Sequence, residues 1–134
     1  MSEMGRIEGE RAPLAASLWT ATANAAPSRP ALAGAQEADV VVIGAGFTGL
    51  SAALHLAEAG RRVIVLEAET PGWGASGRSG GQVNPGLKDN PAVTEAKYGA
   101  LGKRMVARSA AGGDLVFGLI EKHGIQCDAA RVGW

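Results

Sequence analysis

Residues Ala38–Glu67, ADVVVIGAGFTGLSAALHLAEAGRRVIVLE, decide the fold of this chain. The β-branched run Val40–Ile43 predicts a strand that is buried on both faces of a parallel sheet. Gly60 is predicted to end a helix, and Val63–Leu66 is predicted to be a second buried strand. Between the strands, four apolar residues recur at helical spacing: Leu50, Ala53, Leu54 and Ala57. The stretch therefore predicts a β-α-β unit with a parallel sheet, and an α/β fold class.

Three glycines follow the first strand in the pattern G-x-G-x-x-G. Gly44 allows a tight turn, Gly46 lets a pyrophosphate approach the backbone, and Gly49 lets the helix pack on the strand. The N–H groups from Phe47 to Gly49 are expected to point at phosphates. Glu67 lies 18 residues after Gly49, where its carboxylate can accept both ribose hydroxyls. This context predicts a dinucleotide site; the alternative is a nucleotide-free unit with a glycine-rich turn.

Composition limits the remaining possibilities. The 134 residues are enough for one small domain, and thirteen basic against thirteen acidic side chains give no reason to expect a nucleic acid partner. No apolar run reaches the length of a membrane span. The single cysteine, Cys127, fits a reducing compartment, so a cytoplasmic location is predicted. We expect Cys127 to be a small, half-buried apolar residue.

Residues 1–37 are interpreted as an N-terminal arm and residues 38–134 as the domain proper. Acidic residues near the start are untypical of a secretory or mitochondrial targeting segment. A disordered tail is expected over residues 1–12. Trp19 usually needs a surface, so Leu14–Ala21 is expected to dock either on this chain or on a part outside it.

Residues Ala68–Lys88 are rich in glycine and predict an irregular loop. Long irregular loops in compact domains are usually functional, and Trp73 and Val83 give this one apolar anchors. Arg78 supplies a cation that suits phosphate. The loop is therefore expected to wrap a cofactor, with a mobile surface loop as the alternative.

The C-terminal third is predicted to be helical. Asn90 and Pro91 suit a helix start, and a helix is expected to about Tyr98. A second apolar stripe covers Leu101–Lys122, with an interruption around Gly112-Gly113, and Gly124 should end it. Residues Ile125–Val132 are a candidate strand. Neither His55 nor His123 has an orienting acid or nucleophile beside it in a recognisable motif, so no catalytic residue is assigned, and no metal ligand set is predicted.

At Gly44–Gly49, Glu67 and above all Gly72–Val83 (GWGASGRSGGQV), the chain resembles FAD-dependent oxidoreductases of the D-amino-acid oxidase type. The likeness is strongest to its amine-oxidising, gamma-glutamylputrescine oxidase-like branch. The resemblance implies a Rossmann-like FAD-binding unit followed by a glycine-rich cofactor loop and helices. It also implies these cofactor-binding residues: Gly44, Ala45, Gly46, Phe47, Thr48, Gly49, Glu67, Ala68, Ala75, Ser76, Arg78, Ser79, Gly80, Gly81 and Gln82.

The resemblance further implies oxidation of the C–N bond of an amine or amino acid to an imine, with oxygen as acceptor. Family members are about three times as long, so the chain is expected to be an incomplete, N-terminal part without the substrate domain. Some relatives bond the flavin through a histidine near the position of Arg78, so non-covalent FAD is expected here. The alternatives are an NAD(P)-binding reductase domain and a truncated, inactive nucleotide-binding fragment.

Overall fold

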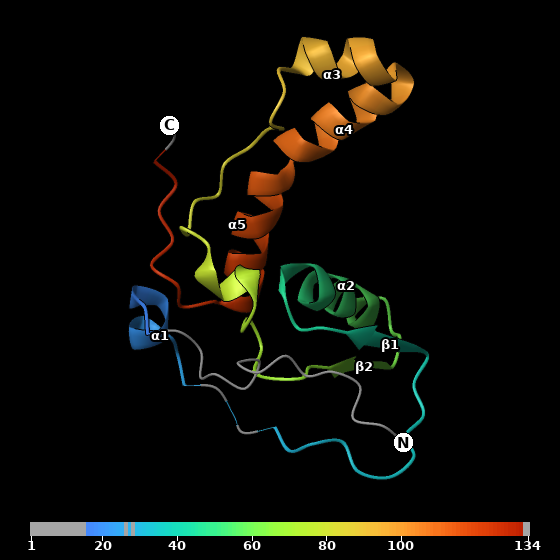
Figure 1. The fold of residues 1–134 in the computed structure, drawn as a ribbon, viewed down its shortest axis with the longest axis vertical. Coiled ribbons are helices and arrows are strands. Elements are labelled where there is room, and N and C mark those ends of the chain that lie inside the picture. Colours follow the sequence, from blue (N-terminus) through green and yellow to red (C-terminus); the bar gives the residue numbers. More distant parts are fainter. Residues whose placement is uncertain (1–15, 26, 28, 133–134) are drawn as a thin grey trace, which may run out of the picture. The chain divides into compact units, whose positions relative to one another are not determined.

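The computed structural model describes residues 16–25, 27 and 29–132. They fall into two compact units that divide between Gly80 and Gly81 (Figure 1). The first unit contains α1 (Leu18–Thr22), β1 (Val40–Ile43), α2 (Phe47–Glu58), β2 (Val63–Leu66) and the 3₁₀ turn η1 (Ala75–Arg78). The second contains α3 (Pro91–Tyr98), α4 (Ala100–Ala110) and α5 (Gly112–His123). The tail predicted over residues 1–12 lies outside the described residues.

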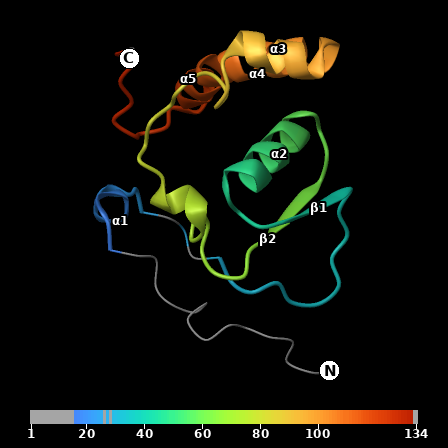
Figure 2. The ribbon, with the colours of Figure 1, turned by 45° about the horizontal axis from the view of Figure 1, so that its top comes forward.

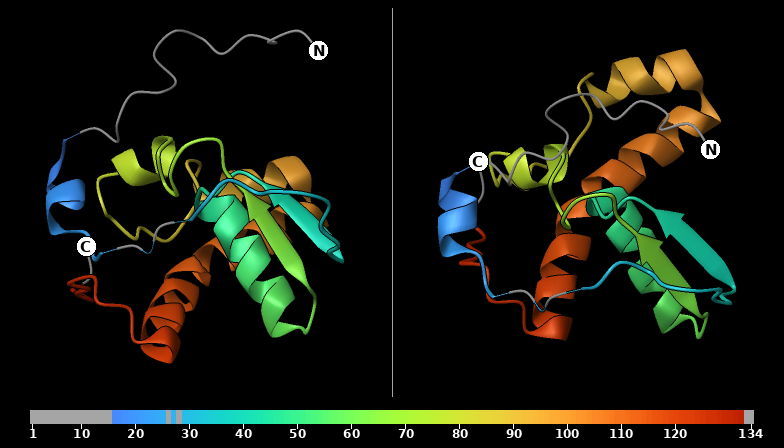
Figure 3. Two further views of the ribbon diagram at one scale, coloured as in Figure 1. Left: turned by 90° about the horizontal axis from the view of Figure 1, so that it is seen from below. Right: turned by 60° about the horizontal axis from the view of Figure 1, so that its bottom comes forward.

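The first unit is built on a parallel pair of strands. β1 and β2 pair in the register Val40↔Val63 to Ile43↔Leu66, and they point the same way with α2 as the crossover between them (Figure 3). At the start of both strands, the Arg62 N–H donates to Asp39 Oδ2 at 2.8 Å, and the Asp39 N–H donates to the Arg62 carbonyl at 2.9 Å. The predicted α/β class and β-α-β unit are confirmed.

The burial predicted for β1 is wrong on one face of the sheet. The side chains alternate, and Val41 and Ile43 are 54% and 86% exposed. α2 packs against one face of the strand pair (Figure 2), and the side chains of β1 that point the other way stay exposed. On α2, Ala53 is buried while Leu50 is 43% exposed.

Gly60, which was predicted to end the helix, makes the turn from α2 to β2. Gly60 has a φ of +79°, which L side chains disfavour. Its N–H donates to the Ala57 carbonyl at 2.9 Å, and the Arg61 N–H donates to the Leu56 carbonyl at 3.0 Å. These two bonds form a Schellman motif, which satisfies carbonyls at the helix end.

α1 was not predicted as a helix, and it begins at a capping box. The Ser17 side chain accepts from the Thr20 N–H at 3.2 Å, and the Thr20 hydroxyl accepts from the Ser17 N–H at 2.8 Å. Leu18 is 66% and Trp19 is 44% exposed. These two side chains are therefore not buried by the described residues, and docking of this segment elsewhere stays a prediction.

In the second unit, α3 and α4 form a helical hairpin. Asn90 Oδ1 accepts from the Ala92 N–H at 2.9 Å, which confirms the predicted cap. Gly99 makes the turn between the helices with a φ of +56°. Gly102 then lies so close to α3 that an added Cβ would overlap the Thr94 carbonyl oxygen and lie 2.9 Å from Glu95 Cα.

The end of the second unit confirms two predictions and corrects two. The helix is interrupted at Ala111, between α4 and α5 and next to the predicted position. Gly124 ends α5 with a φ of +58°. Residues 125–132 form no strand, because no neighbouring strand among the described residues supplies a hydrogen-bonding edge. Cys127 is exposed rather than half-buried.

Candidate functional site

The turn between β1 and α2 is the centre of the candidate site. Gly44 has a φ of +97° and makes the sharp exit from the strand. A Cβ on Gly49 would overlap the Gly44 carbonyl oxygen and lie 3.2 Å from Val42 Cγ1. The conformational roles predicted for Gly44 and Gly49 are therefore confirmed. Ala45 is 2% exposed and anchors the turn in the small core of the unit.

The surroundings of Gly46, where a pyrophosphate was predicted to approach the backbone, differ from the prediction. A Cβ at Gly46 would come 2.9 Å from Ser76 Oγ, so the space over this glycine holds the serine hydroxyl. The Phe47 N–H, which was predicted to point at a phosphate, donates to the same Ser76 Oγ at 2.9 Å. Three N–H groups at the start of α2 were predicted to point at phosphates, and the N–H of Phe47 already has an acceptor within the chain. Thr48 and Gly49 follow it in the first turn, where N–H groups lack intrahelical acceptors.

Glu67 closes the turn from the end of β2. Its Oε2 accepts from the Ala45 N–H at 2.6 Å, and its Oε1 accepts from the Glu69 N–H at 3.1 Å. Hydrogen bonds from backbone N–H groups lower the pKa of the Glu67 carboxyl below its ordinary value. The bond from Ala45 has the largest effect, and those from Glu69 and Ala68 have smaller effects. Each carboxylate oxygen can accept a second hydrogen bond. A role toward ribose hydroxyls is compatible with this geometry and stays a prediction.

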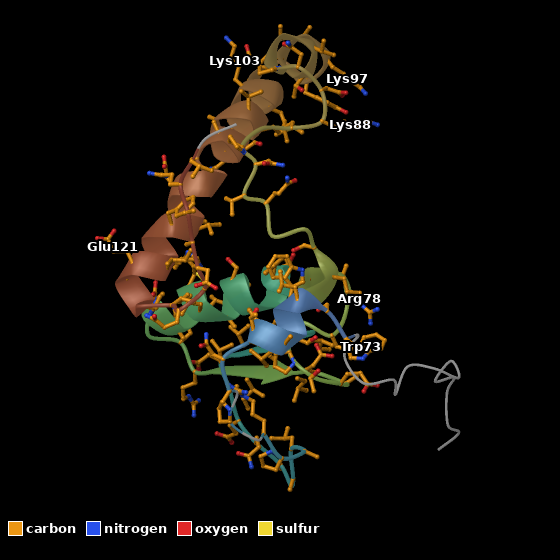
Figure 4. The ribbon with its side chains drawn as sticks, turned by 90° about the vertical axis from the view of Figure 1, so that its left-hand side faces the viewer. Trp73, Arg78, Lys88, Lys97, Lys103 and Glu121 are labelled. Atoms are coloured by element: carbon orange, nitrogen blue, oxygen red, sulfur yellow. The ribbon has the colours of Figure 1, made fainter. Side chains whose placement is uncertain are left out.

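The loop after β2 is partly ordered by its own contacts. The Gly72 N–H donates to the Ala45 carbonyl at 2.9 Å and fastens the loop to the turn. Residues Ala75–Arg78 form a 3₁₀ turn, which refines the predicted irregular loop. The Arg78 guanidinium lies 5.2 Å from the centre of the Trp73 ring, and Arg78 Nε donates to the Trp73 carbonyl at 3.2 Å (Figure 4). Trp73 is half-buried and Arg78 is exposed.

The structure brings the glycine turn, Glu67 and Ser76 together in the first unit. Ala68, Ala75, Ser79 and Gly80 belong to the same unit and are exposed. Gly81 and Gln82 belong to the second unit. Sequence reasoning missed the contact between Gly72 and Ala45, and only the glycine-rich composition of the loop pointed toward it.

Other features of the described residues do not form a competing site. A shallow, mostly apolar recess in the second unit is lined by Pro85, Gly86, Leu87, Asp89, Pro91, Val106 and Ala110. In the part of the chain that the structure describes, no three His, Cys, Asp or Glu side chains gather in a way that could hold a metal ion. His55 is exposed, with Nδ1 2.7 Å from the Ser51 carbonyl oxygen. No helix among these residues is long and apolar enough to cross a membrane.

The turn fits the ADP half of a dinucleotide. It joins a helix start with N–H donors to an adjacent carboxylate, and a side chain at Gly46 would crowd Ser76 Oγ at the entrance to the turn. Residues 39–134 match the family described as FAD dependent oxidoreductase, so the chain belongs to this family of flavoenzymes. Membership implies FAD as the cofactor.

Three curated relatives are similar to this chain in sequence. The chain is 47% identical over 91 residues to gamma-glutamylputrescine oxidoreductase of Escherichia coli, a stretch covering 67% of this chain and 21% of the relative. It is 47% identical over 104 residues to the probable oxidoreductase OrdL of Haemophilus influenzae, covering 74% and 23%. It is 36% identical over 113 residues to OrdL of Rhizobium meliloti, covering 84% and 26%. The chain thus spans about a quarter of the length of these relatives. No solved structure gives a significant match.

Proposed function

We propose that the complete protein oxidises the C–N bond of an amine or amino acid to an imine, with FAD as cofactor and oxygen as acceptor. The observation that carries the FAD site in this proposal is the convergence of the Gly44–Gly49 turn, Glu67 and Ser76 in one unit. The names of relatives support the substrate class: gamma-glutamylputrescine oxidoreductase, and an L-amino acid oxidase of Lachesis muta that is 48% identical over 63 residues.

In this proposal, the residues of the chain bind and orient the cofactor. Thr48 and Gly49 offer N–H donors to the pyrophosphate, Glu67 accepts from the ribose hydroxyls, and the loop residues predicted above approach the phosphates and the flavin. When bound, FAD would supply the redox chemistry: the carbon that bears nitrogen would lose a hydride to it, the nitrogen would lose a proton, and oxygen, the proposed acceptor, would take up the two electrons as hydrogen peroxide. The imine formed is then hydrolysed by water.

The extent of the domain and the mode of attachment are also proposals. Residues 38–134 are the N-terminal part of the FAD-binding domain, preceded by an arm over residues 1–37, and the 134 residues alone do not turn over substrate. Two strands with an exposed apolar face do not enclose an isoalloxazine ring. FAD is held non-covalently, because an exposed Arg78 stands near the place of the histidine that bonds flavin in some relatives. The location is cytoplasmic, as one cysteine suggests.

The family match favours FAD over the NAD(P)-binding reductase alternative. Absorbance of the purified complete protein separates the two, since bound flavin gives a yellow protein. Flavin should leave with the supernatant after acid precipitation, and flavin retained in the pellet would contradict non-covalent attachment.

Peroxide release tests the reaction. The complete protein is assayed with gamma-glutamylputrescine, other amines and amino acids, and the 134-residue chain serves as the matched control. We expect peroxide from the complete protein and none from the control. A colourless complete protein that reduces substrates with a nicotinamide cofactor would overturn the proposal, and peroxide release by the control would overturn the fragment interpretation.

A further inference from the structure

The hairpin of α3 and α4 carries an uneven share of the charge of this chain. Residues 88–108 hold five basic and two acidic side chains, although the whole chain has thirteen of each. The five basic side chains are exposed: Lys88, Lys97, Lys103, Arg104 and Arg108. None of these five has an ion-pair partner among residues 16–25, 27 and 29–132. A chain without net charge therefore carries a local excess of unpaired positive charge.

Apolar side chains lie at the turned end of the same hairpin. Tyr98 is 44% and Leu101 is 54% exposed, on either side of the Gly99 turn, and Val93 on α3 is 55% exposed. Lys97 Nζ lies 5.2 Å from the centre of the Tyr98 ring. The end of the hairpin thus combines exposed apolar side chains with a neighbouring cation.

Basic and apolar side chains share a face on each helix. Val93 and Lys97 are four residues apart on α3, and Leu101, Arg104 and Arg108 are three and four residues apart on α4. Figure 4 shows the side chains of Lys88, Lys97 and Lys103 directed away from the hairpin. A partner for this surface must therefore accept positive charge and apolar side chains together.

An anionic lipid surface meets both demands better than a protein does. Burying charges without partners is costly, and lysine is depleted in protein interfaces. At a membrane, the stems of lysine and arginine lie along apolar groups while their charged ends reach the phosphates of the headgroups. Tyrosine favours the boundary between headgroups and hydrocarbon.

We infer that the α3–α4 hairpin is a peripheral binding surface for a membrane of anionic phospholipids. The five basic side chains contact the lipid phosphates, and Tyr98 and Leu101 enter the boundary below them. Each basic side chain near such a surface strengthens binding by about fivefold. The surface lies outside the residues assigned to FAD, so the inference does not depend on the proposed reaction.

Sedimentation of the complete protein with lipid vesicles tests this inference. One set of vesicles contains equal parts of phosphatidylcholine and phosphatidylglycerol, and the other contains phosphatidylcholine alone. We expect binding to the anionic vesicles only, and we expect salt at about 0.5 M to release the protein, because salt screens charges at the membrane surface. Equal binding to both sets of vesicles, or binding to neither, would overturn the inference. Binding to neither would leave the hairpin to an acidic protein partner.

Charge reversal separates the hairpin from the rest of the chain. Arg104→Glu should weaken binding to the anionic vesicles by roughly tenfold or more. Arg61→Glu is the matched control, because it makes the same change in net charge at an exposed arginine outside the hairpin, and it should bind as the wild type does. Equal losses in the two variants would show attraction by overall charge and would overturn the inference.

Two further variants complete the test. Leu101→Ala should weaken binding by roughly threefold through lost apolar burial and should keep the requirement for anionic lipid. Lys97→Glu replaces Arg104→Glu if circular dichroism shows that the arginine variant does not fold, and it should weaken binding by a similar factor. Unchanged vesicle binding in a folded charge-reversal variant of the hairpin would overturn the inference.

Discussion

Gly49 and Gly102 meet the same steric demand in two different regions of the molecule. In the first unit, a Cβ on Gly49 would overlap the Gly44 carbonyl oxygen; in the second, a Cβ on Gly102 would overlap the Thr94 carbonyl oxygen. Both glycines let a helix approach another backbone segment closely.

The two glycines differ in the groups that lie near them. Around the turn that Gly49 supports, the Glu67 carboxylate and the Ser76 hydroxyl arrive from other segments and bond to backbone N–H groups. The Gly102 contact is with the backbone of α3, around the buried Thr94. A close-approach glycine therefore indicates tight packing, and we expect a binding site beside it only where polar side chains from distant segments also converge.

Substituting both glycines tests this comparison and should give the largest effects. Gly49→Ala and Gly102→Ala should each destabilise the complete protein by about 3 kcal/mol, because a backbone carbonyl must move in each case. Only Gly49→Ala should also abolish FAD binding at temperatures where the protein stays folded. Thermal unfolding and flavin titration measure the two properties, and equal loss of FAD binding in both variants would remove the distinction.

Gly46→Val should act mainly on binding. Its side chain would displace Ser76 Oγ and fill the approach to the turn, so FAD affinity should fall by about 2–3 kcal/mol. Gly74→Ala is the matched control, since nothing lies within 4 Å of a Cβ there. A yellow, fully flavin-loaded Gly46→Val protein would be incompatible with a phosphate site at this turn.

Glu67→Ala should weaken FAD binding by about 1–3 kcal/mol, the scale for losing hydrogen bonds to a charged group. Glu69→Ala is the control, because the contact from Glu69 to Glu67 is made by its backbone N–H. Titration of the flavin-free protein measures both variants, and an unchanged dissociation constant for Glu67→Ala would exclude the ribose role.

The lowered pKa of Glu67 gives a pH test of the same contact. Because the folded pKa is below the ordinary value of 4.5, the ionised carboxylate contributes stability that is present above that pH. This contribution is lost as the pH falls through the folded pKa. In urea unfolding, the stability gap between the wild type and Glu67→Gln should therefore narrow as the pH falls below about 4.5. A stability difference between the two proteins that is independent of pH would show that the charge of the Glu67 carboxylate does not stabilise the turn.

The smallest effect is expected at a glycine without a steric demand. Gly118 lies inside α5 with nothing within 4 Å of an added Cβ. Gly118→Ala should raise the free energy of unfolding by about 0.5–1 kcal/mol through helix propensity. Urea unfolding checks the gain, and a loss would reveal a close contact at this position in the complete protein.

Local signals explain what the sequence could predict. Gly44, Gly60 and Gly124 adopt positive φ where a turn or helix end was predicted, and Asn90 caps α3. These features depend on a few neighbouring residues. Glu67 was also placed correctly at the end of β2, because strand and helix lengths fix where the crossover returns.

Features that depend on distant partners were not predictable in the same way. The bond from Phe47 to Ser76 spans 29 residues, and no local pattern encodes it. Burial on both faces of β1 failed at Ile43, because burial depends on what packs against the sheet. The strand expected over residues 125–132 failed for a related reason, since a strand needs an edge to pair with.

The parallel register of β1 and β2 also determines the order in which the first unit can fold. Val40 pairs with Val63, so the strands meet only after the chain has traversed all of α2 and reversed direction at Gly60. Helix formation is fast and local, whereas closing the loop between parallel strands must first overcome a loss of chain entropy. Strand pairing is therefore predicted to follow helix formation. Substitutions that favour α2 as an isolated helix should speed refolding, while changes in the exposed face of β1 should act chiefly on the unfolding rate.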